Sequence, residues 1–196
     1  MPYSCSMTTD KYTSFAELRG SEPKASFAID VEARPESHVI VIAPHGGKIE
    51  ALTSEIARRI AGSDFSYYSF TGAKPDHNRD LHVTSHRFDE PRAVALVAKH
   101  QWVMAIHGCR GDMPRVLLGG LDLELVEDVS ARLTCRDIDA QTVGHPFEGK
   151  QPGNICNRGA TGRGLQIELT MPFREGERVD DLINGVREAL MWRRAQ

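Results

Sequence analysis

One stretch of the sequence decides the fold: Val39-Ile40-Val41-Ile42-Ala43-Pro44-His45-Gly46-Gly47-Lys48-Ile49-Glu50. Its first half is a continuous apolar run, which is typical of a strand buried on both faces of a parallel sheet. The run ends at a histidine, two glycines follow, and an acid opens the next segment. A second apolar run, from Trp102 to Ile106, ends in the same way at His107-Gly108.

Two strands that end in His-Gly, with an acid five residues after the first histidine, predict a metal site. Imidazole and carboxylate ligands suit zinc, and three protein ligands leave a fourth position for water. We therefore expect His45, Glu50 and His107 to hold one zinc ion per chain. Taken singly, the residues have simpler uses, because a histidine after a strand is more often structural and Glu50 alone would complement a helix dipole.

The composition is that of an ordinary soluble protein. The chain has 196 residues, of which 40% are hydrophobic and 26% charged, and a net charge of −3. Residues 1–196 are expected to form a single monomeric domain with its own core. Neither nucleic acid nor a membrane is an expected partner, because the charge is slightly negative and no run reaches the ~20 apolar residues of a membrane span. The N-terminus lacks a signal-peptide pattern, so we expect synthesis in the cytoplasm without export by that route.

Hydrophobic periodicity predicts alternating strands and helices. Strands are expected at 39–44, 67–70, 81–85, 102–106, 115–118 and 165–170, and helices at 50–60, 91–100, 122–136 and 179–194. Residues 1–37 are expected to be a polar segment that docks on the body, irregular from residue 10 except for a short helix at 12–18. The alternation predicts an α/β fold, with a mixed, mostly parallel sheet and helices on both faces. Ligands of such sheets gather at the carboxyl ends of the strands, where His45, His107 and Glu168 are expected.

Glu168 is an acid in an otherwise apolar strand. Burying it is costly unless it has a partner or a role, so it is a candidate functional residue. The alternative is that it faces solvent together with Gln166 and Thr170. His82 and His86 could contact the metal ligands without binding the metal themselves, but a structural use is favoured for both.

A glycine-rich, basic loop precedes the Glu168 strand at residues 154–164. Its glycines permit unusual backbone angles, and Arg158 and Arg163 offer planar guanidinium groups for carboxylate recognition. A flexible surface loop explains the same composition equally well.

The four cysteines contain no C-x-x-C pair and are expected to be free thiols; they are Cys5, Cys109, Cys135 and Cys156. Cys109 follows His107 by two residues, and a strand would place both side chains on one face. A thiolate ligand at Cys109 is therefore an alternative, although Gly108 and Gly111 favour a strand that has already ended.

Six motifs in matching order resemble the poly-γ-glutamate hydrolase family of phages and bacteria. They are Ala43–Glu50, Val83–Pro91, Ile106–Cys109, Leu118–Asp122, Asn154–Gly159 and Gln166–Leu169. The resemblance runs from about residue 10 to residue 173 and implies a zinc peptidase related in fold to carboxypeptidase A and the zinc N-acetylmuramoyl-L-alanine amidases. Classical carboxypeptidases have His-x2-Glu where this chain has His-x4-Glu, which favours the poly-γ-glutamate branch.

The resemblance also implies roles for particular residues. By motif, His45, Glu50 and His107 would hold zinc and Glu168 would be the general base. The implied activity is hydrolysis of γ-glutamyl amide bonds in poly-γ-glutamate, as in capsule degradation, with release by host lysis if a bacteriophage encodes the chain. The polymer carries one free carboxylate per residue, so the residues expected to bind it are Arg158, which would also stabilise the oxyanion, Arg163, Asn157 and Arg110.

Three alternatives remain open at the level of the sequence. One is an amidase or endopeptidase that cleaves γ-D-glutamyl bonds of peptidoglycan. Another is a non-catalytic protein that binds carboxylated polymers, although the retained Glu168 argues against it. The third is a Cys-His hydrolase that uses Cys109 or Cys156.

Overall fold

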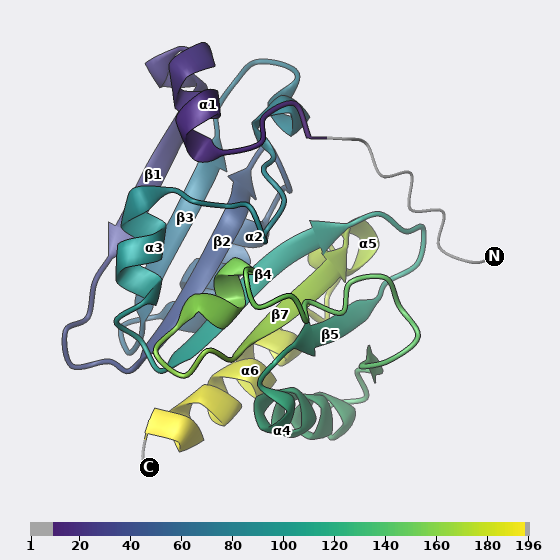
Figure 1. The fold of residues 1–196 in the computed structure, drawn as a ribbon. Coiled ribbons are helices and arrows are strands. Elements are labelled where there is room, and N and C mark those ends of the chain that lie inside the picture. The colour runs from purple at the N-terminus through teal and green to yellow at the C-terminus, as the bar shows by residue number, and fades with distance from the viewer. Residues whose placement is uncertain (1–9, 195–196) are drawn as a thin grey trace.

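Seven strands form one mixed sheet in the computed structural model, which describes residues 10–194 (Figure 1). The strand order is β1-β3-β2-β4-β7-β5-β6. The strands are β1 Phe27–Glu32, β2 Val39–Gly47, β3 Ser66–Gly72, β4 Trp102–Cys109, β5 Val116–Gly120, β6 Ala140–Gln141 and β7 Gly164–Thr170. Neighbours are parallel except β1 beside β3 and β5 beside β7, which confirms the predicted mixed, mostly parallel sheet.

Helices cover both faces of the sheet, as the alternating pattern predicts (Figure 1). The α-helices are α1 Phe15–Ser21, α2 Thr53–Ala61, α3 Pro91–Val97, α4 Leu123–Thr134, α5 Met171–Arg174 and α6 Val179–Arg194, and the 3-10 helices are η1 Lys24–Ser26, η2 Asn78–Leu81 and η3 Ile155–Arg158. One core lies under α2, α4 and α6, and the other under α1, α3 and η3. None of the helices described is long and apolar enough to cross a membrane.

Alternation along the central strands decides which side chains face which core. In β4, Met104 and Ile106 face the α2-α4-α6 core, so His107 points to the opposite face. In β7, Leu165, Ile167 and Leu169 face that same core, so Glu168 points with His107. The register pairs His107 with Glu168 across β4 and β7. The fold therefore sets these two side chains side by side.

The predictions for residues 81–85 and for residues 10–37 are wrong. Residues 81–85 are not a strand, because the chain forms η2 and then turns, and the backbone N–H groups of His82 and Arg87 donate to nearby carbonyls instead of a neighbouring strand. Residues 10–37 are not irregular outside one short helix. They contain β1, which pairs antiparallel with β3 and forms one edge of the sheet.

Candidate metal centre

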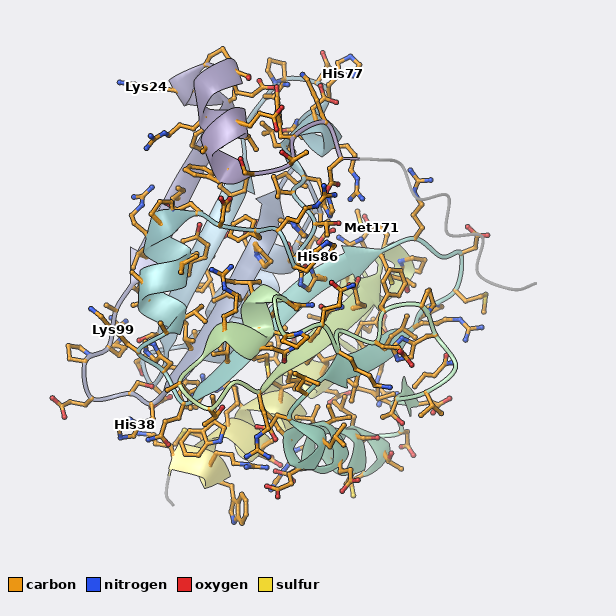
Figure 2. The ribbon with its side chains drawn as sticks, in the orientation of Figure 1. Lys24, His38, His77, His86, Lys99 and Met171 are labelled. Atoms are coloured by element: carbon orange, nitrogen blue, oxygen red, sulfur yellow. The ribbon has the colours of Figure 1, made fainter. Side chains whose placement is uncertain are left out.

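The candidate residues lie at one edge of the sheet, where three parallel strands end. His45 lies near the end of β2, His107 near the end of β4 and Glu168 near the end of β7. In Figure 2, Met171 directly after β7 lies at this edge, whereas His38 directly before β2 lies at the opposite one. This is the carboxyl edge, at which ligands of α/β sheets gather.

A backbone carbonyl orients the ring of His45. Its Nε2 lies 2.8 Å from the carbonyl oxygen of Val83, and since a carbonyl can only accept, this nitrogen carries the proton. In the neutral ring, Nδ1 is left with a lone pair. That atom lies 3.2 Å from Nδ1 of His107 and 3.4 Å from Oε1 of Glu50. His45 thus turns its Nδ1 toward two other ligand-type side chains in a buried space.

A tight turn brings Glu50 beside His45. The backbone N–H of Glu50 donates to the carbonyl of His45 at 2.9 Å, and the hydroxyl of Thr53 donates to the carbonyl of Glu50 at 2.7 Å. The helix predicted from residue 50 therefore begins only at Thr53, after Leu52 in the left-handed conformation with a φ of 70°. Because of this turn, a spacing of four intervening residues brings the imidazole of His45 and the carboxylate of Glu50 together.

The buried Glu50 side chain is an anion. Its Oε2 accepts the backbone N–H of Gly108 at 2.8 Å. Burial by itself would raise the pKa of this carboxyl, but the rings of His45 and His107 hold the pKa well below its usual value. A buried carboxylate that stays ionised needs positive charge or hydrogen-bond donors around it.

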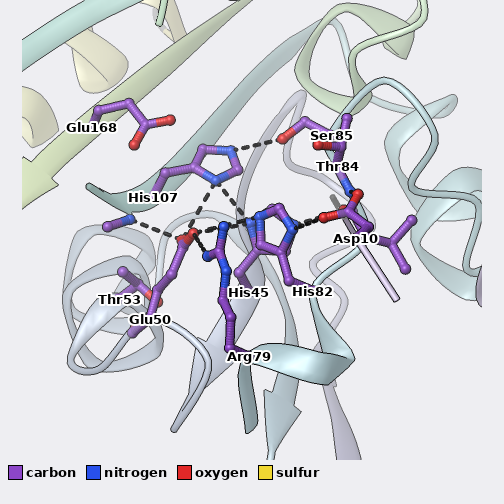
Figure 3. Close-up of polar contacts among 12 residues, drawn as sticks. Asp10, His45, Glu50, Thr53, Arg79, His82, Thr84, Ser85, His107 and Glu168 are labelled. Atoms are coloured by element: carbon purple, nitrogen blue, oxygen red, sulfur yellow. Dashed lines mark hydrogen bonds and ion pairs between the residues drawn. The ribbon is translucent and has the colours of Figure 1, made fainter. Parts of the chain in front are cut away.

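Figure 3 shows the ring of His107 beside His45 and Glu50. Its Nδ1 lies 3.6 Å from Oε2 of Glu50, and its Nε2 lies 3.5 Å from the hydroxyl of Ser85. Nδ1 of His45 lies 3.2 Å from Nδ1 of His107, and the two imidazoles face different oxygens of Glu50, Oε1 at 3.4 Å and Oε2 at 3.6 Å. Zinc bonds of about 2.0–2.1 Å in a tetrahedron put neighbouring ligand atoms about 3.3 Å apart, which is close to these contact distances.

His82 is a further donor that sequence reasoning assigned to a structural use. Its ring stacks on that of His45 with centroids 4.0 Å apart, and its Nε2 lies 3.8 Å from Oε1 of Glu50. Within the described part of the chain, His45, Glu50 and His82 form a group that could hold a metal ion, with ligand atoms all within 4.8 Å of one another. The other ring nitrogen of His82, Nδ1, lies 2.6 Å from Oδ1 of Asp10 (Figure 3). No local sequence pattern links these two residues.

Glu168 is buried next to His107 (Figure 3). The alternative that it faces solvent is wrong, because the segment at 154–158 covers this face and Asn154 donates to Gln166 at 2.8 Å. Gln166 in turn donates to Oε1 of Glu168 at 3.1 Å. Burial, opposed by His107 and reinforced by Glu50, raises the pKa of Glu168 to about 7. A carboxyl with such a pKa can both accept and release a proton near neutral pH.

The cysteines in the described range, Cys109, Cys135 and Cys156, form no disulfide. Cys109 belongs to β4, so the strand has not ended at Gly108 as the sequence favoured. Burial raises the pKa of Cys109 and of Cys156 to about 12, which keeps both protonated. A protonated thiol is a poor ligand and nucleophile, which argues against the cysteine alternatives. Cys5 lies outside the described residues.

The basic loop contributes less to the centre than its composition suggests. Arg158 donates to the carbonyl of Phe88 at 2.8 Å, and Arg163 and Arg110 are exposed. The amide of Asn157 is buried, donates to the carbonyls of Gly149 and Gln151, and accepts from the N–H groups of Leu121 and Gly164. Both ends of this amide are saturated by backbone, so its geometry indicates a loop anchor rather than a substrate contact.

Two arginines near the centre were missed by sequence reasoning. Nη1 of Arg79, in η2, lies 3.6 Å from Oε1 of Glu50. Arg174, in α5, is buried and donates to the carbonyl of Ala51 beside Glu50. Neither arginine lies in a pattern that sequence alone could have singled out, because both reach the centre from segments between or after the predicted strands.

Buried imidazoles and carboxylates at the carboxyl edge of an α/β sheet, with one carboxyl whose pKa is raised, define a hydrolase-type site with a candidate metal centre. The chain belongs to the poly-gamma-glutamate hydrolase family, whose model matches residues 12–177. The family resemblance carried by the six sequence motifs is thereby confirmed.

Relatives of known sequence cover most of the chain. It is 36% identical to the UPF0714 protein YndL of Bacillus subtilis (strain 168) over 176 residues, which are 89% of this chain and 69% of YndL. The SPbeta prophage-derived UPF0714 protein YoqZ of the same organism is 36% identical over 173 residues, which are 86% of this chain and 61% of YoqZ.

Solved structures share the fold. A bacteriophage poly-gamma-glutamate hydrolase matches with a TM-score of 0.90 at 31% identity, over 94% of this chain and 98% of that one. A zinc-free apo form of YndL matches with a TM-score of 0.85 at 31% identity, over 95% and 98% of the two chains. N-formylglutamate amidohydrolase from Ralstonia eutropha JMP134 shares the fold alone, with a TM-score of 0.57 at 13% identity over 87% and 98% of the two chains.

Proposed function

We propose that this protein is a zinc-dependent hydrolase that cleaves the γ-glutamyl amide bonds of poly-γ-glutamate. The observation that carries the proposal is the convergence of His45, Glu50 and His107 beside the buried Glu168. The two Nδ1 atoms lie 3.2 Å apart, and they lie 3.4 and 3.6 Å from Oε1 and Oε2 of Glu50. Membership of the poly-gamma-glutamate hydrolase family supports the substrate class.

The residues fit zinc. Two imidazole nitrogens and one carboxylate are its usual protein ligands at catalytic sites. In the neutral ring of His45, Nδ1 carries the lone pair because Nε2 donates to the carbonyl of Val83, and the pKa of Glu50 is well below its usual value. A zinc ion held there supplies Lewis-acid activation of water and of the scissile carbonyl. The zinc-free form of the relative YndL indicates that zinc is relevant to that protein.

Glu168 handles the proton in this proposal. Its carboxylate accepts a proton from the attacking water, and the resulting carboxyl passes it to the nitrogen of the departing amine. Its place opposite His107 in the register keeps it beside the ligands. Its position on a central strand limits its movement, so the proton acceptor is held ready for the reaction.

Arginines bind the polymer in this proposal. Each γ-linked residue carries a free carboxylate, and a guanidinium binds carboxylate with two parallel hydrogen bonds. Arg79 is the arginine placed beside Glu50, and Arg158, Arg163 and Arg110 are the further candidates on the basic loops. Local cations reconcile a polyanionic substrate with a chain whose net charge is −3.

Metal analysis combined with a polymer assay tests the function. We expect the full chain to bind about one zinc ion and to lower the molecular mass of poly-γ-glutamate, with activity lost on chelation and restored by zinc. His45→Ala should lose tight zinc binding and activity while remaining folded. His38→Ala is the matched control, because His38 is exposed at the opposite edge of the sheet.

Other outcomes would redirect the assignment. Stoichiometric zinc in His45→Ala would contradict the metal site. Cleavage of γ-D-glutamyl muropeptides in preference to poly-γ-glutamate would make peptidoglycan the substrate. Binding of the polymer without any shortening would make the protein a non-catalytic binder.

A further inference from the structure

Asp10 binds the loop that carries His82 with both of its carboxylate oxygens. Its side chain is 5% exposed. Oδ1 lies 2.6 Å from Nδ1 of His82, and Oδ2 accepts the backbone N–H of Thr84 at 2.7 Å, with Arg87 at 3.4 Å. Asp10 precedes the part of the chain that the family model matches, residues 12–177. A residue outside the family match thus makes the shortest polar contact of His82.

The contact with Asp10 decides which nitrogen of His82 carries the proton. A carboxylate can only accept, so Nδ1 of His82 donates to Asp10. In the neutral ring this leaves Nε2 with its lone pair. Nε2 is the nitrogen that lies 3.8 Å from Oε1 of Glu50, and the ring is held in place by stacking on His45.

Acceptor atoms from three side chains therefore meet in one buried space. They are Nε2 of His82, Oε1 of Glu50 and Nδ1 of His45, and all three belong to the group that could hold a metal ion. Nδ1 of His45 also lies 3.2 Å from Nδ1 of His107, and Oε1 of Glu50 lies 3.6 Å from Nη1 of Arg79. A metal ion among the three atoms would bind their lone pairs directly and displace a proton held between the two histidines. The orientation that Asp10 imposes on His82 is the one that favours such a cation.

We propose that Asp10 is a positioning residue of the metal centre and acts through His82, whose Nε2 it holds toward the ion as an additional donor. The inference rests on the proposed zinc site at His45, Glu50 and His107 and adds to it a histidine and its carboxylate support. Carboxylates that fix the remote nitrogen of a metal-site histidine contribute about ten- to a hundredfold to metal affinity.

The replacement Asp10→Asn is the sharpest variant, because it keeps the shape of the side chain. The amide oxygen can still accept the N–H of Thr84, which directs the amide NH2 toward Nδ1 of His82. An NH2 group donates, so the ring proton moves to Nε2 and its lone pair is lost to the centre. His82→Ala removes the donor itself.

A control variant separates this effect from a loosened N-terminal segment. Oδ1 of Asp89 accepts the backbone N–H of Phe15 at 2.6 Å, so it ties the same segment to the same loop without contacting His82. Asp89→Asn likewise exchanges a carboxylate for an amide of equal size, at a second contact between the N-terminal segment and this loop. Thermal unfolding of the zinc-free variants shows whether Asp10→Asn and Asp89→Asn cost similar stability.

Zinc affinity is measured for each full-length protein by competition with a chromophoric chelator, and the site is also read from the absorption spectrum with Co²⁺. We expect Asp10→Asn and His82→Ala to weaken zinc binding about ten- to a hundredfold and to shift the Co²⁺ spectrum. Asp89→Asn should keep the wild-type affinity and spectrum.

Several results would overturn the inference. Wild-type affinity in Asp10→Asn would do so while leaving the proposed function intact, and so would a loss in Asp10→Asn that His82→Ala does not share. Equal losses in Asp10→Asn and Asp89→Asn would assign the effect to the segment rather than to His82. A wild-type chain that binds no zinc would contradict the proposed function and this inference together.

Discussion

At the scale of single residues, Arg79 has the two properties of a substrate-binding cation. Its Nη1 lies 3.6 Å from Oε1 of Glu50, so it reaches the centre, and its side chain is 51% exposed, so a ligand can reach it. Arg158, by contrast, already donates to the carbonyl of Phe88. We therefore expect Arg79 to contribute more than Arg158 to binding the carboxylates of the polymer.

Replacing Arg79 with alanine should raise KM for γ-glutamyl oligomers about ten- to a hundredfold, since a hydrogen bond between charged groups is worth ~1.5–3 kcal/mol. The effect on kcat should be smaller, because the carboxylate is bound in both the ground state and the transition state. Steady-state kinetics measures both constants. Arg59→Ala is a suitable control, because Arg59 is 52% exposed and pairs with Asp180 instead. An unchanged KM in Arg79→Ala would move the substrate clamp to another arginine.

The sequence predicted some residues near the centre and missed others for a physical reason. His45, His107 and Glu168 end apolar strands, and a strand's periodicity and direction fix where its end lies. Asp10, Arg79 and His82 come from segments outside the sheet and the α-helices, and their positions depend on contacts between distant parts of the chain. The contact between Asp10 and His82 spans 72 residues, so no local pattern contains it.

At the scale of elements, α5 contacts and stabilises the turn that carries Glu50. The guanidinium of Arg174 donates to the carbonyl of Ala51 and fills the space beside Gly108. A Cβ on Gly108 would lie 2.6 Å from Cζ of Arg174, which is closer than real Cβ contacts. Gly108 also donates its backbone N–H to Glu50, so the absence of a side chain at this position lets β4, the turn and α5 meet.

Gly108→Ala should therefore displace Arg174 and loosen the turn. Only the end of the Arg174 side chain has to move, so we expect a loss of stability of about 1 kcal/mol from its broken hydrogen bond, together with weaker zinc binding. Chemical denaturation and chelator competition measure the two effects. Gly20→Ala is the control, since nothing lies within 4 Å of a Cβ added there.

A double variant tests whether the clash is the cause. If Gly108→Ala acts by displacing Arg174, then Gly108→Ala with Arg174→Ala should be no less stable than Arg174→Ala alone. Additive losses in the double variant would contradict the steric explanation and would assign Gly108 a role independent of Arg174.

At the scale of the whole molecule, the sequence predicted the centre of the sheet better than its edges. The apolar runs of β2, β4 and β7 are buried on both faces, and this is a strong local signal. β1 is an edge strand with half-exposed and exposed side chains, so its sequence does not distinguish it from a loop. Only its pairing with β3 in the folded chain makes it a strand. The antiparallel direction of β5 against β7 is likewise a property of the assembled sheet.

The assembled sheet is also what brings Glu168 to the candidate ligands. Glu168 lies 61 positions after His107 in the sequence, yet the parallel register of β4 and β7 sets the two opposite each other. We propose that this arrangement makes Glu168 the base of a metal-dependent hydrolase. A structural acid or a further metal ligand at the same position would behave differently on substitution.

The most direct measurement is the zinc content and the rate of poly-γ-glutamate cleavage by Glu168→Gln, with the exposed Glu148→Gln as control. Glutamine keeps the shape of the side chain and removes only the basic oxygen. The account predicts one zinc ion per chain, an unchanged melting temperature and a rate lower by ~10²–10⁴, the usual contribution of general acid–base catalysis. Near-normal cleavage by Glu168→Gln with its zinc in place would contradict the account, and loss of the zinc would make Glu168 a ligand instead.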